Sequence, residues 1–234
     1  MSDILLYVSQ NKGNEELRYA VRTWEKNLKF DKLYAVGGPT PDWFKPDIMQ
    51  LNPMKYTKMR QCYDNLIVAL NDDRLSEDVI LMMDDIFLLK PCGEWEINYN
   101  RGTLQSQLDR LGFANRKGDS YLDMVNRTKI ELEKTMTDPL SFEEHLPFRC
   151  NRKKLLKILE DYGPERMQHL LYRSIYGNIY KSPTEFKLDL KLKGMQDQVP
   201  KDVMAFSTNG LSFRGNGGSY MKYHFQQPSR FERH

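Results

Sequence analysis

The sequence has few cysteines and no long apolar run. Its 234 residues include three cysteines, Cys62, Cys92 and Cys150, and none belongs to a CxxC pair or to another spacing typical of a metal site. We therefore expect reduced, structural thiols in a cytoplasmic protein. No stretch approaches the ~20 apolar residues of a membrane-spanning helix, and the first residues lack the basic and apolar pattern of a signal peptide. These absences predict a chain without a transmembrane segment.

Several nucleotide-binding and hydrolase motifs are also missing. There is no GxGxxG, no GxxxxGK[ST] and no GxSxG, which argues against a Rossmann dinucleotide site, a P-loop enzyme and a serine hydrolase elbow. The glycine-rich stretch 214–218 follows a late strand but opens no clear helix, so we expect a lid or turn there. The formal net charge is only +3, which is weak for a dedicated nucleic-acid binder but suits an anionic substrate.

The first hundred residues alternate between strand and helix patterns. The predicted strands cover residues 4–9, 32–36, 48–51, 79–83 and 86–89, and the predicted helices cover 15–28 and 55–71. Residues 79–83 (VILMM) contain no polar side chain, which is typical of a strand buried on both faces in a parallel sheet. This order predicts an α/β fold with a mostly parallel central sheet flanked by helices.

The second half of the chain is more helical. Helical patterns cover residues 104–111, 121–135, 152–162 and 164–176, and a late strand is expected at 203–207. No Pro/Gly/Ser-rich linker divides the chain. We therefore expect one domain, residues 1–234, with a more helical C-terminal half.

Asp84 and Asp85 directly follow the most apolar strand. Ligands of open α/β sheets bind at the carboxyl ends of the strands, and two adjacent carboxylates there repel each other unless a positive group lies near. Mg²⁺ and Mn²⁺ take carboxylate oxygens and keep positions open for substrate phosphates. The pair therefore predicts a divalent metal site, and a surface turn with two solvated acids is the alternative.

Basic residues and one histidine are further candidates. Arg18 and Arg22 lie four residues apart on one predicted helix, and Lys58 lies at the start of the next; forked guanidinium groups bind diphosphates well. Their alternative is a solvated, charged helix face. His145 lies in a loop before a helix, where it could act as a base near neutral pH or be structural. Arg149 begins a basic cluster through Lys154 that could meet a phosphate backbone or be solvated.

Several blocks, in order, resemble the Stealth family of sugar-phosphate transferases, within the wider GT-A glycosyltransferase architecture. The blocks are Asn14–Asn27, Gly37–Phe44, Met83–Leu88, His145–Arg149, Ser207–Gly210 and Pro228–Glu232. Two positions depart from the family pattern: Met83 replaces an asparagine, and Gly210 stands where the last block carries an aspartate. The second departure favours transfer of a sugar over transfer of a sugar phosphate, as in a compact bacterial or phage relative.

The resemblance implies a nucleotide-diphosphate sugar as donor, with residues 1–100 binding the donor and 101–234 facing the acceptor. It implies that Asp84 and Asp85 bind Mn²⁺ or Mg²⁺ and that His145, Asp85 and Arg149 lie at the reacting centre. The side chains expected at the donor are Arg18, Arg22, Lys58, Asn11 and Asn209.

The sequence thus predicts a metal-dependent glycosyltransferase that moves a sugar to a hydroxyl of a glycan or of a hydroxymethylated DNA base. One alternative is a sugar-1-phosphate transferase of the Stealth type acting on a cell-surface polysaccharide. Another is an inactive module that binds nucleotide sugars. Which bond of the donor breaks distinguishes the first two: attack at the anomeric carbon transfers sugar, and attack at the β-phosphorus transfers sugar phosphate.

Overall fold

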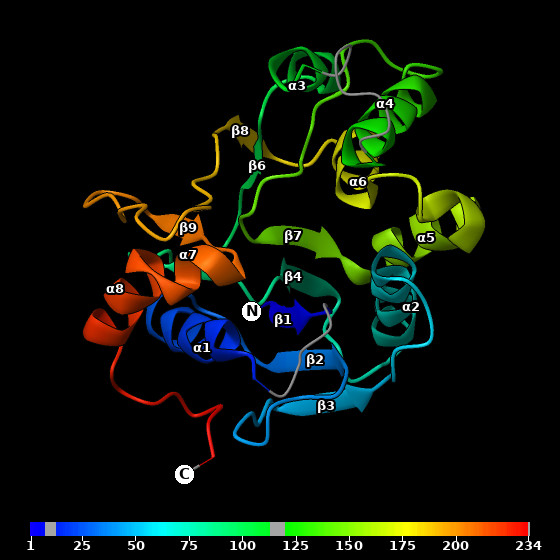
Figure 1. Ribbon diagram of the computed structural model, residues 1–234. Coiled ribbons are helices and arrows are strands. Elements are labelled where there is room, and N and C mark those ends of the chain that lie inside the picture. The colour runs from blue at the N-terminus through cyan, green and yellow to red at the C-terminus, as the bar shows by residue number, and fades with distance from the viewer. Residues whose placement is uncertain (8–12, 113–119, 234) are drawn as a thin grey trace.

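Five strands form the central sheet of the computed structural model, which describes residues 1–7, 13–112 and 120–233 (Figure 1). In sheet order they are β3 (Ile48–Leu51), β2 (Leu33–Gly37), β1 (Asp3–Leu6), β4 (Asp78–Met82) and β7 (Phe148–Asn151). The first four run parallel, and β7 pairs antiparallel with β4. The carboxyl ends of the four parallel strands therefore share one edge, and the Asp84–Asp85 pair follows β4 at that edge.

Helices cover both faces of this sheet (Figure 1). Alternate residues of β4 point to opposite sides, as the two-residue period of a strand requires. Ile80 and Met82 join the core that contains helix α1 (Glu15–Asn27), while Val79 and Leu81 pack with the opposite helices. Those helices are α2 (Lys58–Leu70), α5 (Arg152–Met167) and α6 (Tyr172–Ile179).

A second, two-stranded layer lies against α1. Strand β5 (Ile86–Leu88) pairs antiparallel with β9 (Ala205–Ser207). Trp24 Nε1 donates to the carbonyl oxygen of Ile86 at 2.8 Å, and Asn27 Nδ2 donates to that of Leu88 at 2.6 Å. Because β5 begins right after Asp85, these buried contacts fix the chain on the C-terminal side of the acid pair. Helices α7 (Gly210–Arg214) and α8 (Asn216–His224) complete this layer.

A smaller unit extends beyond β7. Strand β6 (Asn98–Asn100) pairs parallel with β8 (Thr184–Phe186). Helices α3 (Leu104–Arg110) and α4 (Ser120–Leu132) pack around a separate apolar cluster, at the top of Figure 1. No helix in the described ranges is both long and apolar enough to cross a bilayer.

The expected fold class is confirmed, and most expected elements lie within a few residues of their predicted bounds. Two predictions in the C-terminal half were wrong. Residues 148–151 form strand β7 rather than a loop, because they add to the open edge of β4. The helix expected at 164–176 is divided: α5 continues through a kink at Gly163, where φ is 66°, and α6 begins only at Tyr172.

The glycine-rich stretch 214–218 is not a lid: Gly215 forms a turn between α7 and α8, and α8 begins within the stretch. A Cβ on Gly218 would lie 1.8 Å from the carbonyl oxygen of Phe213, and one on Gly215 would lie 2.1 Å from that of Met195. The glycines therefore serve close backbone packing between the two short helices and a neighbouring loop.

Candidate active site

Asp84 is tied to the start of helix α1. The Nδ2 of Asn14 donates to Asp84 Oδ2 at 2.5 Å, while Oδ1 of the same amide accepts from the backbone nitrogen of Leu17 at 3.0 Å. Asn14 is thus the N-cap of α1 and also a partner of the acid pair. The start of α1 and the segment that follows β4 meet at this one side chain.

Asp85 has one paired oxygen and one unpaired oxygen. Oδ2 lies 3.2 Å from Lys191 Nζ and 3.8 Å from His145 Nδ1. Oδ1 is buried and has no hydrogen-bond partner among the residues that the structure describes. A buried carboxylate oxygen without a donor is costly in a folded protein, so this atom indicates a position for a positively charged ligand.

A third carboxylate lies close to the pair. Glu16, in the first turn of α1, accepts a hydrogen bond from Thr208 Oγ1 at 2.6 Å. The backbone nitrogen of Thr208 also donates to the carbonyl oxygen of Asp85 at 3.2 Å. Burial and the charge of Asp85 raise the pKa of Glu16. Negative charge is therefore concentrated where α1, β4 and β9 meet.

This concentration of charge changes the pKa of Asp84. Burial, and then the neighbouring charge of Asp85, raise the pKa of Asp84 to about 6, against the lowering effects of the Asn14 hydrogen bond and the Lys58 charge. A carboxyl that holds its proton close to neutral pH lies in a site with too little compensating positive charge. The site therefore favours the arrival of a cation.

His145 is neutral in this setting. Burial, and then the charge of Lys191, lower the pKa of His145 to about 4, although Asp85 and Asp189 act in the opposite direction. A neutral imidazole has one acceptor nitrogen, and Nδ1 lies 3.2 Å from Lys191 Nζ. The ring can thus accept a hydrogen bond from the ammonium group while it lies beside Asp85.

The donor set fits an open metal site. No three His, Cys, Asp or Glu side chains among the described residues form a group that could hold a metal by themselves. Mg²⁺ and Mn²⁺ are commonly bound by one or two carboxylates together with substrate phosphates and waters. The unpaired oxygen of Asp85 and the raised pKa of Asp84 agree with such a site, in which Asp84 and Asp85 would supply the protein ligands.

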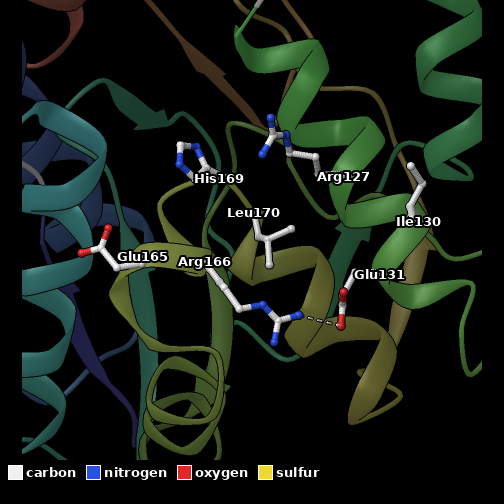
Figure 2. A pocket seen from close by; sticks show the side chains of 7 residues that line it. All are labelled: Arg127, Ile130, Glu131, Glu165, Arg166, His169 and Leu170. Atoms are coloured by element: carbon white, nitrogen blue, oxygen red, sulfur yellow. Dashed lines mark ion pairs between the residues drawn. The ribbon is translucent and has the colours of Figure 1, made fainter.

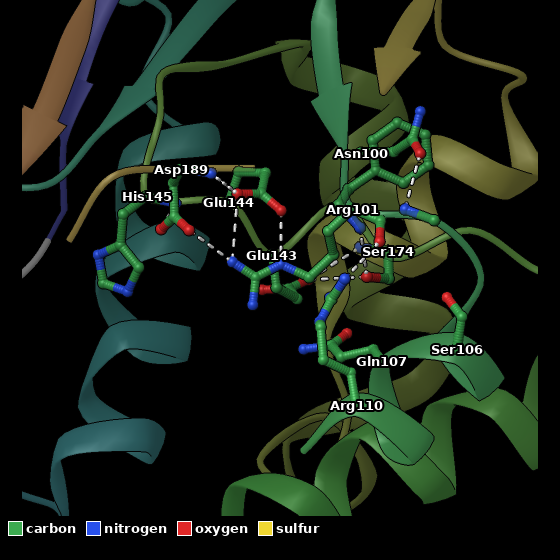
Figure 3. A network of polar contacts seen from close by, with 12 residues as sticks. Asn100, Arg101, Ser106, Gln107, Arg110, Glu143, Glu144, His145, Ser174 and Asp189 are labelled. Atoms are coloured by element: carbon green, nitrogen blue, oxygen red, sulfur yellow. Dashed lines mark hydrogen bonds and ion pairs between the residues drawn. The ribbon is translucent and has the colours of Figure 1, made fainter. Parts of the chain in front are cut away.

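A buried ionic network lies beside His145, and Figure 3 shows Arg101, Glu144 and Asp189 within it. Arg101 bridges two acids: Nε lies 2.5 Å from Glu144 Oε1, and Nη2 lies 2.8 Å from Asp189 Oδ1. Asp189 Oδ2 in turn accepts from the backbone nitrogen of His145 at 2.9 Å. The network therefore fixes the segment that carries Lys191 against the loop that carries His145.

The structure does not bring the two arginines of α1 to the acid pair. Arg22 makes two hydrogen bonds to Glu232, at 2.7 and 2.8 Å. The guanidinium carbon of Arg18 lies 4.7 Å from the centre of the Trp43 ring, and Arg18 Nε lies 3.6 Å from Glu232. Both side chains thus hold the C-terminal tail, and their expected contact with a donor stays a prediction.

The other predicted site residues lie in different places. Lys58 is exposed at the start of α2, and its charge acts on Asp84. Arg149 pairs with Asp78 at 3.0 Å, at the end of β4 opposite to the acid pair. Asn209 caps helix α7. Asn11 lies outside the described residues.

Sequence reasoning missed Lys191, Glu16 and Thr208 as members of the site. A signal for Lys191 was present, because residues 187–193 alternate polar and apolar side chains. In a strand-like segment this places Asp189 and Lys191 on one side and buried Leu192 on the other. Nothing in the sequence reveals that this segment meets Asp85, which lies 106 residues earlier.

A separate cleft lies between α4 and the end of α5 (Figure 2). It has a volume of about 330 Å³ and is lined by Arg127, Ile130, Glu131, Glu165, Arg166, His169 and Leu170. Arg166 pairs with Glu131 across it at 3.1 Å. None of these residues contacts the acid pair, so the cleft is not part of the candidate active site.

Comparison with known proteins supports the fold. No protein-family model and no curated protein sequence matches this chain. A solved structure of galactosyltransferase LgtC, in complex with donor and acceptor sugar analogues, matches with a TM-score of 0.51 at 9% identity, over 97% of this chain and 98% of that one. At that identity the likeness concerns the fold alone. The chain has a GT-A-like fold, and the Stealth resemblance stays a prediction from the sequence blocks.

Proposed function

We propose that this chain is a metal-dependent glycosyltransferase, which moves a sugar from a nucleotide-diphosphate sugar to a hydroxyl acceptor. The observation that carries the proposal is the buried, unpaired Oδ1 of Asp85 at the carboxyl edge of the sheet, beside Asp84. The GT-A-like fold supports it, since LgtC, the structural neighbour, is a galactosyltransferase bound to donor and acceptor sugar analogues.

The side chains at the site have complementary roles in this proposal. Asp84 and Asp85 hold Mn²⁺ or Mg²⁺, which when bound would neutralise charge on the departing diphosphate. Lys191, beside Asp85, and Lys58, whose charge reaches Asp84, attract the phosphate groups. His145 is neutral at pH 7, and its acceptor nitrogen can take the proton of the acceptor hydroxyl once the Lys191 ammonium group has moved from it to the phosphate groups.

A glycan is the favoured acceptor. The basic cluster at 149–154 was the main argument for DNA, and three of its cations are paired with acids. The pairs are Arg149–Asp78 at 3.0 Å, Arg152–Asp73 at 3.4 Å and Lys153–Glu77 at 2.8 Å. Paired cations gain less from contact with a phosphate backbone than free ones do, so this surface offers little to a DNA acceptor.

Donor turnover tests the proposal directly. The protein is incubated with UDP-, GDP-, dTDP- and CMP-sugars, with Mn²⁺ or with EDTA, with and without simple sugar acceptors, and the released nucleotide is identified by mass. Metal-dependent release of a nucleoside diphosphate is the expected result. Release of a monophosphate from the diphosphate donors would instead indicate sugar-phosphate transfer, and binding of a donor without release would indicate an inactive binding module.

A further inference from the structure

Lys191 neutralises Asp85 in the protein without ligands. Its Nζ lies 3.2 Å from Asp85 Oδ2, and the two side chains are 25% and 18% exposed. In the described ranges it is the nearest cationic group to this carboxylate, since the only other ion-pair partner, His145, lies 3.8 Å away and is neutral at pH 7. The ammonium group therefore neutralises the carboxylate whose other oxygen, Oδ1, would meet a metal ion at this site.

The ammonium group can leave without movement of the backbone. The main chain on both sides of Lys191 is bonded to β9: Leu192 N donates to Ser207 O, and Ser207 N donates to Leu190 O, each at 2.9 Å. The side chain itself is a flexible four-carbon stem that ends in a compact charge. A fixed Cα with a rotatable stem lets the ammonium group reach different partners around one point.

The surrounding charges favour two alternative positions of the Lys191 ammonium group, one at Asp85 and one at a bound diphosphate. The charge of Lys191 acts on Glu16 as well as on Asp85, and the charge of Lys58 acts on Asp84. A divalent cation bound to Asp85 would lie next to the ammonium group and be repelled by it. A diphosphate at the same edge would attract that ammonium group, because a lysine binds phosphate as a point charge.

We infer that Lys191 competes with the divalent cation for Asp85 and moves to the donor diphosphate when the diphosphate binds. This inference rests on the proposed function. Its consequence is a coupling between the two ligands: the diphosphate draws Lys191 away from Asp85 and so strengthens metal binding, and the metal strengthens diphosphate binding by the same factor. The free protein binds metal weakly, and one lysine sets the order in which the site fills.

Metal titration of the free protein tests the competition. Mn²⁺ binding is measured by electron paramagnetic resonance of the free ion, on the full chain and without any nucleotide. We expect Lys191→Met to bind Mn²⁺ at least tenfold more tightly than the wild type, and Lys191→Arg to stay close to the wild type. Lys193→Met is the matched control, because Lys193 is exposed two residues later and should change the affinity little.

A second titration tests the other position of the ammonium group. Inorganic pyrophosphate is added by calorimetry in metal-free buffer, and Lys191→Met should bind it at least tenfold more weakly than the wild type. Unchanged pyrophosphate affinity would overturn the movement to the diphosphate. Circular dichroism and melting temperature confirm that each variant is folded.

The outcomes separate this inference from the proposed function. If Lys191→Met and the wild type bind Mn²⁺ equally while Asp85→Asn abolishes binding, the competition is wrong and the metal site stands. If Asp85→Asn and the wild type bind Mn²⁺ equally, or no variant binds it, the metal site and the inference both fail. Tighter binding in Lys191→Met that is lost in the double variant with Asp85→Asn supports both.

Discussion

The side chain of Asn14 donates to Asp84 with one end and caps helix α1 with the other. The donated hydrogen bond measures 2.5 Å, and the capping bond from Leu17 N measures 3.0 Å. The stability of the first helix and the charge state of the acid pair are therefore linked through one amide. Substitutions at this position can separate the two roles, because aspartate caps a helix as well as asparagine does but cannot donate.

We expect Asn14→Ala to lose about 1 kcal/mol of unfolding free energy at pH 5, because the cap is lost, and more at pH 8, because the charged Asp84 then also loses its hydrogen-bond donor. Asn14→Asp keeps the cap. At pH 5 the protonated Asp84 can donate to the new carboxylate, so the loss is small, whereas at pH 8 two facing carboxylates cost about 2 kcal/mol or more. Urea unfolding of the wild type and both variants at pH 5 and pH 8 measures these losses of unfolding free energy. Equal losses for Asn14→Asp at pH 5 and pH 8 would contradict the contact with Asp84.

The raised pKa of Asp84 predicts an unusual pH dependence of stability. An aspartate in the unfolded chain titrates near pH 4, whereas Asp84 titrates at about 6 in the folded protein. Between these values the folded state binds more protons, so the contribution of this group to stability falls as pH rises from about 4 to about 6 and is constant above. Without metal, we expect Asp84→Asn to be more stable than the wild type by about 2 kcal/mol at pH 8 and nearly equal at pH 4.

The comparison with Asp84→Asn is needed because titration of His145 changes stability with pH in the direction opposite to that of Asp84. Its pKa is lowered to about 4, so its contribution to stability rises with pH between about 4 and 6.5. We therefore measure the unfolding free energy of both proteins as a function of pH. Subtracting the wild-type curve from the Asp84→Asn curve removes the contribution of His145. Asp202→Asn, at a carboxylate that is 99% exposed, serves as control, and its difference curve should be flat. A flat curve for Asp84→Asn as well would refute the raised pKa.

The sequence predicted the sheet and the location of the acid pair well, because both depend on local patterns. The apolar run at 79–83 is typical of a buried strand, and aspartates that follow such a strand lie at the carboxyl edge. The cap at Asn14 follows from an equally local pattern, an asparagine directly before a predicted helix. These features need only the period of a strand and the chemistry of a helix start.

The rest of the site depends on contacts between distant segments. Lys191 reaches Asp85 across 106 residues, and Arg22 reaches Glu232 across 210. A helix face with two arginines has the same pattern whether it binds a diphosphate or holds a C-terminal tail. Only the structure shows that Glu232 already binds the guanidinium group of Arg22.

Asp85→Asn should reduce metal-dependent release of nucleoside diphosphate at least about a hundredfold, because a neutral amide is a poor ligand for a hard cation. The protein should stay folded, since the carboxylate already has an unpaired oxygen. Asp73→Asn is the matched control, because Asp73 is 99% exposed and pairs with Arg152 outside the site. Normal turnover by Asp85→Asn would rule out the proposed role of this carboxylate.

The network around Arg101 predicts a strongly destabilising substitution. Arg101→Met would leave Glu144, which is 1% exposed, without its cation, and loss of one partner from a buried pair costs about 3–5 kcal/mol. Arg110→Met, on the exposed end of α3, should change stability by less than about 0.5 kcal/mol. Chemical denaturation measures both. A loss below about 1 kcal/mol for Arg101→Met would show that the network does not hold the loop of His145.

Two glycines at the C-terminal helices predict opposite effects of the same substitution. Gly210 is exposed at the first position of α7, and a Cβ there would meet no atom within 4 Å. Gly210→Ala should therefore stabilise the protein by about 0.5 kcal/mol, through the lower entropy of the unfolded chain. A Cβ on Gly218 would lie 1.8 Å from the carbonyl oxygen of Phe213. Gly218→Ala should cost about 2 kcal/mol or more, because α7 and α8 must separate. Melting temperatures that shift in the same direction for both variants would contradict the close packing of these helices.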